Sequence, residues 1–122
     1  MAQQQDLEIM QGSDYNQVFK FFEDEEKTIP LDLTGVTAAM KIRLEDYDGK
    51  VLIDLVSPTY LSINEGASTI GVNIPSAMSS ALSPVNKGDD SISGVYDLEI
   101  TNAGIVTRVV QGVAIITREA TR

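Results

Sequence analysis

The most regular pattern of hydrophobic and polar positions lies in the last third of the chain. Residues 92–100 alternate between apolar and polar side chains, with Val95 as the one apolar exception on the polar side. A period of two over nine residues predicts a strand with one buried and one solvent-facing side. Residues 102–104 (Asn-Ala-Gly) form a predicted turn, and the apolar stretch 105–117 returns from it. We therefore predict a long antiparallel hairpin, with a bulge or bend at Gly112 on its return arm.

The rest of the chain shows the same alternation in shorter stretches. Residues 36–44 alternate most cleanly, and an Asp48-Gly49 turn should link them to the next strand. Pro75, followed by apolar residues at three-to-four spacing, predicts one or two turns of helix over 75–82. Residues 29–35 are expected to cross between sheet edges, with Asp32 or Thr34 bonding the local backbone. Further strands are predicted at 7–10, 15–22, 51–56, 60–63 and 68–74.

Seven to nine short strands separated by turns at fairly regular spacing predict an all-β protein, an antiparallel β-sandwich with one short helix near 75–82. A chain of 122 residues is long enough to bury a core as one domain, residues 1–122. Residues 1–5 are polar, and we expect them to form a flexible N-terminal arm or to lie on a neighbouring molecule.

Composition narrows the chemistry that this sandwich can perform. The chain has no cysteine and no histidine, which excludes disulfides, Cys/His zinc sites, Ser-His-Asp triads and Cys-His dyads. The formal net charge is −9, which makes binding to nucleic acid unfavourable and favours solubility or binding to a basic protein. No apolar run approaches the ~20 residues of a membrane helix, and we expect no secretion signal.

Carboxylates are the remaining candidates for chemistry. The acidic run 23–26 could attract a hard cation, but it lacks the alternating ligands and central glycine of a calcium loop. It is better interpreted as a solvated hairpin tip, or as a site that docks a basic partner. Asp97 and Glu99 are expected to be solvated or paired with Arg108 and Lys41. A glycosidase would need two carboxylates held ~5–10 Å apart, and the chain has no tryptophan to stack on a sugar. We predict no catalytic, cofactor or metal site.

Two aromatic residues have alternative interpretations. Tyr96 is expected to pack in the core with its hydroxyl at the rim, rather than to contact a ligand. Phe22 ends a predicted strand, where it is either partly covered by the fold or, together with Val18, forms a contact surface for a partner.

The order of these segments resembles a known family. Residues 7–14 (LEIMQGSD) resemble its opening motif, and residues 30–35 (PLDLTG) followed by 37–43 (TAAMKIR) are similar to its I-D-L-T-G and T-A-x-M-x-I-R motifs. Residues 94–100 (GVYDLEI) and 111–115 (QGVAI), with Thr121-Arg122, resemble its last two strands. The family comprises small Ig-like β-sandwich domains of tailed-phage structural proteins, including the N-terminal domain of the upper baseplate protein.

The resemblance implies an Ig-like sandwich and a non-enzymatic structural protein of a tailed-phage virion. We expect assembly in the tail, baseplate or neck and collar region, by contacts with other virion proteins and copies of the chain. No membrane, nucleic acid or small-molecule substrate is expected, and localisation would be the virion, after synthesis in the bacterial host cytoplasm. Alternatives are capsid decoration or a head fibre, a host-surface carbohydrate-binding module, an assembly factor absent from the particle, or an enzyme. The candidate partner-binding residues are Gln3, Gln4, Gln5, Phe22, Glu23, Asp24, Glu25, Glu26, Arg118 and Arg122.

Overall fold

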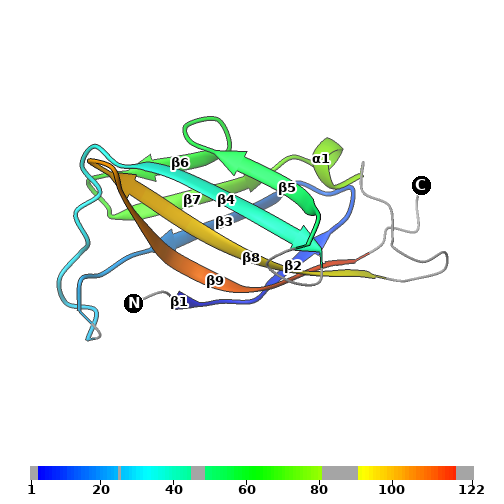
Figure 1. Cartoon of the computed structure of the whole chain (residues 1–122), viewed down its shortest axis with the longest axis horizontal. Coiled ribbons are helices and arrows are strands. Elements are labelled where there is room, and N and C mark those ends of the chain that lie inside the picture. The colour runs from blue at the N-terminus through cyan, green and yellow to red at the C-terminus, as the bar shows by residue number, and fades with distance from the viewer. Residues whose placement is uncertain (1–2, 25, 45–48, 81–90, 118–122) are drawn as a thin grey trace.

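The computed structural model describes residues 3–24, 26–44, 49–80 and 91–117. These residues form two packed β-sheets with one short helix at one end (Figure 1). The elements are β1 (Gln3–Gln4), β2 (Leu7–Met10), β3 (Tyr15–Lys20), β4 (Thr37–Leu44), β5 (Val51–Val56), β6 (Leu61–Asn64), β7 (Thr69–Ile74), α1 (Ser76–Ser80), β8 (Ser91–Asn102) and β9 (Ile105–Thr117).

In the described part of the chain, one sheet has six strands and the other has three. The larger sheet runs β9-β8-β4-β5, and both β1 and β2 lie along the outer edge of β9, parallel to it. The smaller sheet has the order β3-β7-β6, and all its pairings are antiparallel. This arrangement matches that of immunoglobulin variable domains, with β4, β5, β8 and β9 as strands C, C′, F and G and β3, β7 and β6 as B, E and D. The predicted fold class, an antiparallel Ig-like sandwich, is confirmed.

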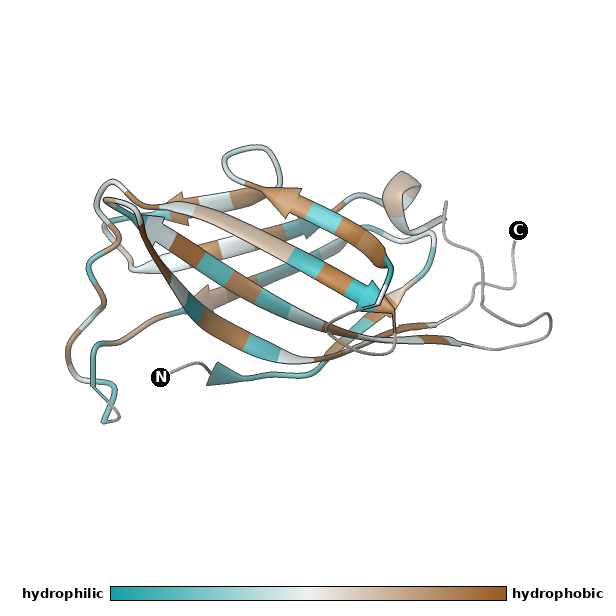
Figure 2. Cartoon of the chain, viewed as in Figure 1, coloured by the Kyte–Doolittle hydropathy of each residue, from teal (hydrophilic) through white to brown (hydrophobic). Residues whose placement is uncertain are grey.

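The hydrophobic alternation of the sequence becomes the division between core and surface (Figure 2). In β8 the predicted inner face is buried throughout, from Ile92 to Ile100. In β4 the buried residues are Ala38, Met40 and Ile42, between exposed neighbours. The two inner faces form one apolar cluster, which holds the sheets together in this cysteine-free chain.

The predicted bulge in β9 exists, but it is not at Gly112. Leu98 pairs with Val110 and the next residue, Glu99, pairs with Arg108, so Val109 is the extra residue. The bulge turns Val109 and Val110 both toward the core, where both are buried. Gly112 instead lies in regular register opposite Tyr96.

Gly112 allows the N-terminal segment to pass close to β9. A Cβ atom added there would lie 2.9 Å from the carbonyl carbon of Gln5, and closer still to its oxygen. The Gln5 carbonyl accepts a hydrogen bond from the Tyr96 hydroxyl. Tyr96 packs in the core as predicted, but its ring is 1% exposed, and its hydroxyl bonds this segment instead of lying at the rim. Gly112 is therefore required for the close approach of the Gln5 backbone to β9, and it does not form a bulge.

The structure places the predicted N-terminal arm along its own sheet. Gln3 and Gln4 pair with Val110 and Gln111, and the Gln5 amide donates to the Gln111 carbonyl at 3.0 Å. Polar side chains do not oppose this arrangement, because strand pairing uses backbone groups. The Gln5 carbonyl points toward the Tyr96 hydroxyl and not toward β9. The Val113 amide of β9 therefore donates its proton to the Asp6 carboxylate, at 3.1 Å. Residues 1 and 2 lie outside the described part of the chain.

The remaining local predictions have mixed outcomes. The segment before β4 does carry the chain from the smaller sheet to the larger one, and Asp32 Oδ1 accepts the Thr34 amide proton at 2.9 Å, as predicted. Strand β3 ends at Lys20 rather than at residue 22, because the chain then bends into a loop closed by a bridge between Phe22 and Pro30. The predicted short helix is present as α1 (Ser76–Ser80); residues 81–82 of its predicted range and Asp48 of the predicted turn lie outside the described residues.

Candidate interaction surfaces

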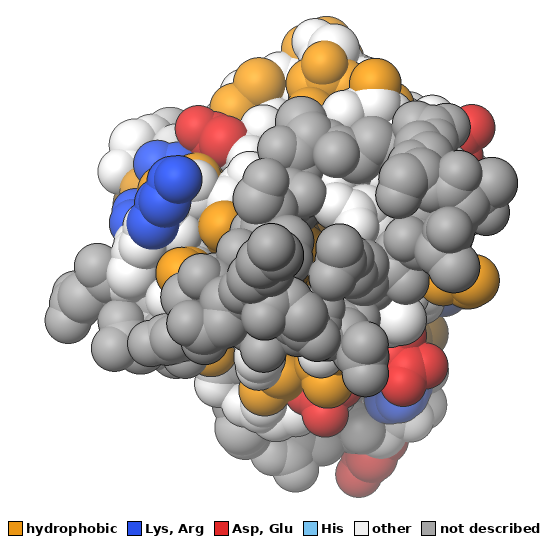
Figure 3. Space-filling view, turned by 90° about the vertical axis from the view of Figure 1, so that its right-hand side faces the viewer, with side chains coloured by type: hydrophobic (Ala, Val, Ile, Leu, Met, Phe, Trp, Pro, Cys, Tyr) orange, Lys and Arg blue, Asp and Glu red, His pale blue; other side chains and the backbone are white. Residues whose placement is uncertain are grey.

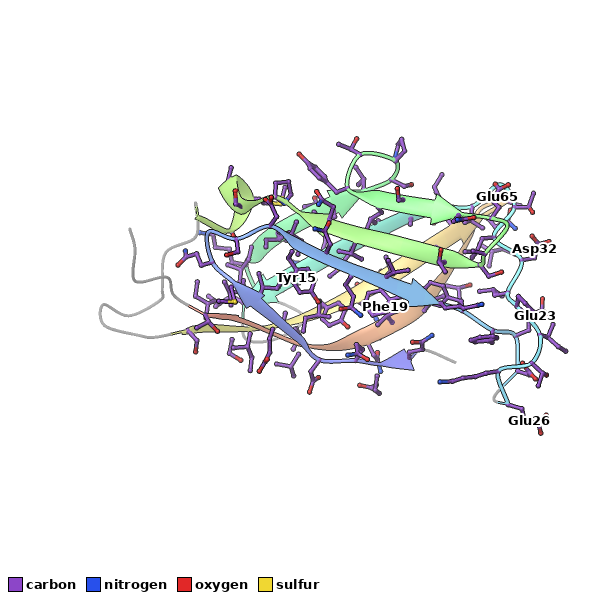
Figure 4. All side chains as sticks on the ribbon, turned by 180° about the vertical axis from the view of Figure 1, so that it is seen from behind. Tyr15, Phe19, Glu23, Glu26, Asp32 and Glu65 are labelled. Atoms are coloured by element: carbon purple, nitrogen blue, oxygen red, sulfur yellow. The ribbon has the colours of Figure 1, made fainter. Side chains whose placement is uncertain are left out.

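The acidic loop (residues 23–26) lies at the end of the sandwich opposite α1. Figure 4 shows Glu23, Glu26, Asp32 and Glu65 projecting from loops at this one end. The carboxylates of Glu23 and Glu26 are exposed, and Glu25 lies outside the described residues. Glu65 is engaged, because its Oε2 accepts the Gly35 amide proton at 3.2 Å. The predicted hairpin tip is therefore an acidic surface on one end of the molecule.

Asp24 has a structural role within that loop. Its Oδ1 accepts amide protons from Thr28 at 2.9 Å and from Ile29 at 3.0 Å, and its Oδ2 accepts the Thr28 hydroxyl proton. The hydrogen bond from the Thr28 hydroxyl, followed by that from the Ile29 amide, lowers the pKa of Asp24 below its usual value. Because these bonds use both carboxylate oxygens, Asp24 holds the loop closed, and Glu23 and Glu26 are left to present charge. In the described part of the chain, no three acidic side chains are grouped to hold a metal ion.

A groove of about 760 Å³ lies beside the acidic loop. Its apolar lining comes from the segment between β3 and β4, which contributes Phe21, Phe22 and Leu31, and from β9, which contributes Val109. Lys20 places its ammonium group 5.7 Å from the centre of the Phe22 ring, within cation–π range. The polar lining consists of Gln3, Glu23, Asp24, Lys27, Thr107 and Arg108. We call this feature the end groove.

Phe22 and Val18 do not share a surface. Val18 is exposed on the outer face of the smaller sheet, where it lines a shallow groove with Ser62 and Gly71. Phe22 instead lines the end groove. The structure therefore separates the two residues that the sequence had suggested as one contact surface.

The outer face of the larger sheet carries a row of opposite charges. Lys41 is in register with Asp54 on one side and with Asp97 on the other. Arg108 Nε lies 3.1 Å from Asp97 Oδ2, which confirms the predicted pairing of these two residues. The side chains of Arg108 and Asp97 are 49% and 17% exposed, and a partly exposed ion pair of this kind contributes little to stability.

The structure brings few of the other predicted partner-binding residues together. The Gln3 side chain donates to the Lys20 carbonyl at 2.9 Å, which ties β1 to the end of β3. Arg118 and Arg122 lie outside the described residues. Figure 3 views the end of the sandwich opposite the acidic loop, where the described hydrophobic side chains are interspersed with charged ones.

Sequence reasoning missed the exposed apolar residues at the tip of the β8–β9 hairpin. Ile105 and Val106 are 70% and 57% exposed. The available signal was two consecutive apolar residues directly after the turn, where period-two alternation would place a polar one. An exposed apolar pair at the end of a long hairpin is a candidate contact for another protein.

Comparison with protein-family models and with curated proteins finds no match to this chain. The one helix in the described residues is too short to cross a membrane. The molecule is a mostly β protein with two packed sheets.

Proposed function

We propose that this chain is a non-enzymatic structural protein of a tailed-phage virion, which assembles in the tail, baseplate or neck and collar region by protein–protein contacts. The observation that carries the proposal is the agreement between the motifs and the fold. The segments that resemble the phage family form the framework of an Ig-like sandwich. Residues 30–35 cross between the sheets, 37–43 form most of β4, and 94–100 lie in β8.

The surfaces are suited to assembly. The end with the acidic loop combines exposed carboxylates, the end groove and the exposed tip of the β8–β9 hairpin. Apolar contacts flanked by charge give a protein interface both affinity and orientation. The carbohydrate-binding alternative gains no support from the described aromatic residues, since each is buried or partly covered.

Mass spectrometry of purified phage particles tests the proposal directly. The chain should be present at a fixed ratio to the major tail proteins after the particles are banded on a density gradient. A chain that is abundant in the lysate but missing from the banded particles would overturn the proposal and favour an assembly factor.

The acidic loop provides a matched pair of variants. Glu23→Gln with Glu26→Gln removes two exposed charges at the proposed contact, and Asp54→Asn with Glu8→Gln removes two exposed charges elsewhere. We expect the first pair to reduce incorporation into particles several-fold and the second to leave it unchanged. If both double variants were incorporated equally, the acidic loop would not be part of the assembly surface, although the chain could still be a component of the virion.

A further inference from the structure

The tip of the β8–β9 hairpin (residues 102–106) combines two unfavourable features. Ile105 and Val106 expose large apolar side chains to water. The two-residue turn before them contains Ala103 at φ 51° and Gly104 at φ 82°, and a non-glycine residue in the left-handed region is strained. An exposed apolar tip on a strained turn suggests that the tip makes a contact that the isolated chain lacks.

The end groove lies directly beside this tip. Ile105, Thr107 and Val109, the last of which is the bulge residue, occupy alternate positions of β9, so they lie on one face of the strand. Thr107 and Val109 line the groove, and the Cα atoms of Ile105 and Val109 are about 13 Å apart for four residues of strand. Ile105 and the apolar groove therefore form one continuous surface, whereas Val106 lies on the opposite face of β9, where it lines a groove with Lys41 and Arg108.

We propose that this surface binds a second copy of the chain, in a two-fold symmetric dimer where the tip of each copy occupies the end groove of the other. A two-fold interface uses the same patch twice, so it requires a patch that fits itself. A tip adjacent to a groove meets that requirement, because one rotation seats both tips at once.

The charges of the two parts also match. The tip, Asn102 to Val106, has no charged side chain. The groove lining carries two carboxylates, Glu23 and Asp24, and two cations, Lys27 and Arg108, and Arg108 is also paired with Asp97. An uncharged tip entering this groove of mixed charge brings no like charges together, whereas a strongly basic segment would meet Lys27 and Arg108 as well as the two carboxylates.

The expected dimer is weak and depends on salt. A contact formed by a hairpin tip and a groove of this size belongs to the small, transient class of interfaces. Each copy carries a formal net charge of −9, so the copies repel one another at low ionic strength. Added salt screens that repulsion and should strengthen the dimer, whereas it would weaken binding of a basic partner to the acidic loop.

Sedimentation equilibrium of the purified chain, up to ~1 mM and at low and high salt, measures this association. Ile105→Ser should lower the association constant about a hundredfold, because each dimer loses two buried isoleucines. Phe22→Ser, in the groove, should also lower it. Met10→Ser is the control, since Met10 is 68% exposed but pairs with Thr117 at the other end of β9.

Crosslinking identifies the contact independently, because the chain has no cysteine of its own. An oxidised mixture of two single variants, Ile105→Cys and Lys27→Cys, should form a mixed disulfide dimer, whereas Met10→Cys with Lys27→Cys should not. A chain that stays monomeric at every protein and salt concentration would overturn the proposal. So would an association constant that Ile105→Ser leaves unchanged, or a failure of the Ile105→Cys and Lys27→Cys variants to form the mixed disulfide. These results leave the virion proposal untouched, since that depends on the content of purified particles.

Discussion

Gly112→Ala tests the contact that fixes the N-terminal segment to the sandwich. The new methyl group would lie 2.9 Å from the carbonyl carbon of Gln5 and closer to its oxygen, and both atoms belong to the backbone. Because the backbone cannot rotate away as a side chain could, the segment around Gln5 has to move off β9. That movement weakens the hydrogen bond from the Tyr96 hydroxyl to Gln5 and the one from the Val113 amide to Asp6.

The expected cost follows from these contacts. Inserting a methyl group into a packed site costs ~1–3 kcal/mol, and a weakened hydrogen bond adds ~0.5–1.5 kcal/mol. Alanine recovers ~0.4–1 kcal/mol, because it restricts the unfolded chain more than glycine does. We expect a net loss of ~2 kcal/mol in the free energy of unfolding, or a fall of roughly 6–10 °C in Tm for a domain of this size.

Urea unfolding followed by circular dichroism measures this loss. Gly71→Ala is the matched control: it is also a strand glycine, but a Cβ there would be 3.7 Å from its nearest neighbour, Ser62 Cβ. We expect that control to be neutral or slightly stabilising. If Gly112→Ala were within ~0.5 kcal/mol of the unmodified chain, the reasoning would be refuted.

A double-mutant cycle with Tyr96→Phe identifies the mechanism. Removing the hydroxyl should cost ~1 kcal/mol in the unmodified chain. It should cost much less in the Gly112→Ala background, because the Gln5 carbonyl has already moved. Additive effects would mean that the methyl group is accommodated without disturbing this hydrogen bond.

Three further predictions concern local features. Ala103→Gly should raise the free energy of unfolding by ~0.5–1 kcal/mol, because glycine adopts a positive φ without strain; an unchanged or lower value in urea unfolding would contradict the strained turn. Asp24 has a lowered pKa in the folded chain, so its contribution to stability is present above its unfolded pKa and lost as the pH falls through the folded one; an NMR titration of the Thr28 amide should give a midpoint below the usual pKa of an aspartate, and a midpoint above it would show that the bonds do not hold. The Arg108–Asp97 ion pair should give a coupling energy of only ~0.2–1 kcal/mol in a double-mutant cycle, decreasing with salt; a larger value that salt does not change would show that the pair is shielded from solvent.

Much of the strand structure could be predicted because alternation is local. A residue and its neighbour two positions along share a face of a strand, so a pattern such as that of β8 already separates core from surface. The turn at residues 102–104, the hydrogen bond within Asp32-Leu33-Thr34 and the crossing before β4 are equally short-range. The arms of the predicted hairpin also place Arg108 near both acidic residues: it pairs in register with Glu99 and reaches diagonally to Asp97, which lies opposite Gln111.

The sequence could not show which segments meet across long separations, and the tertiary structure decided those contacts. The bulge at Val109 follows from the fit of β9 against β8 and the core; the consecutive Val109 and Val110 break the alternation there, but they do not show that both face the core. Gly112 attracted attention as a glycine in a strand, but its role depends on Gln5, more than a hundred residues away. The end groove likewise joins Phe22 and Leu31 to Val109 only after the sandwich closes. Local periodicity determines which face of each strand is buried, whereas the partner of that face is set by the packing of the whole chain.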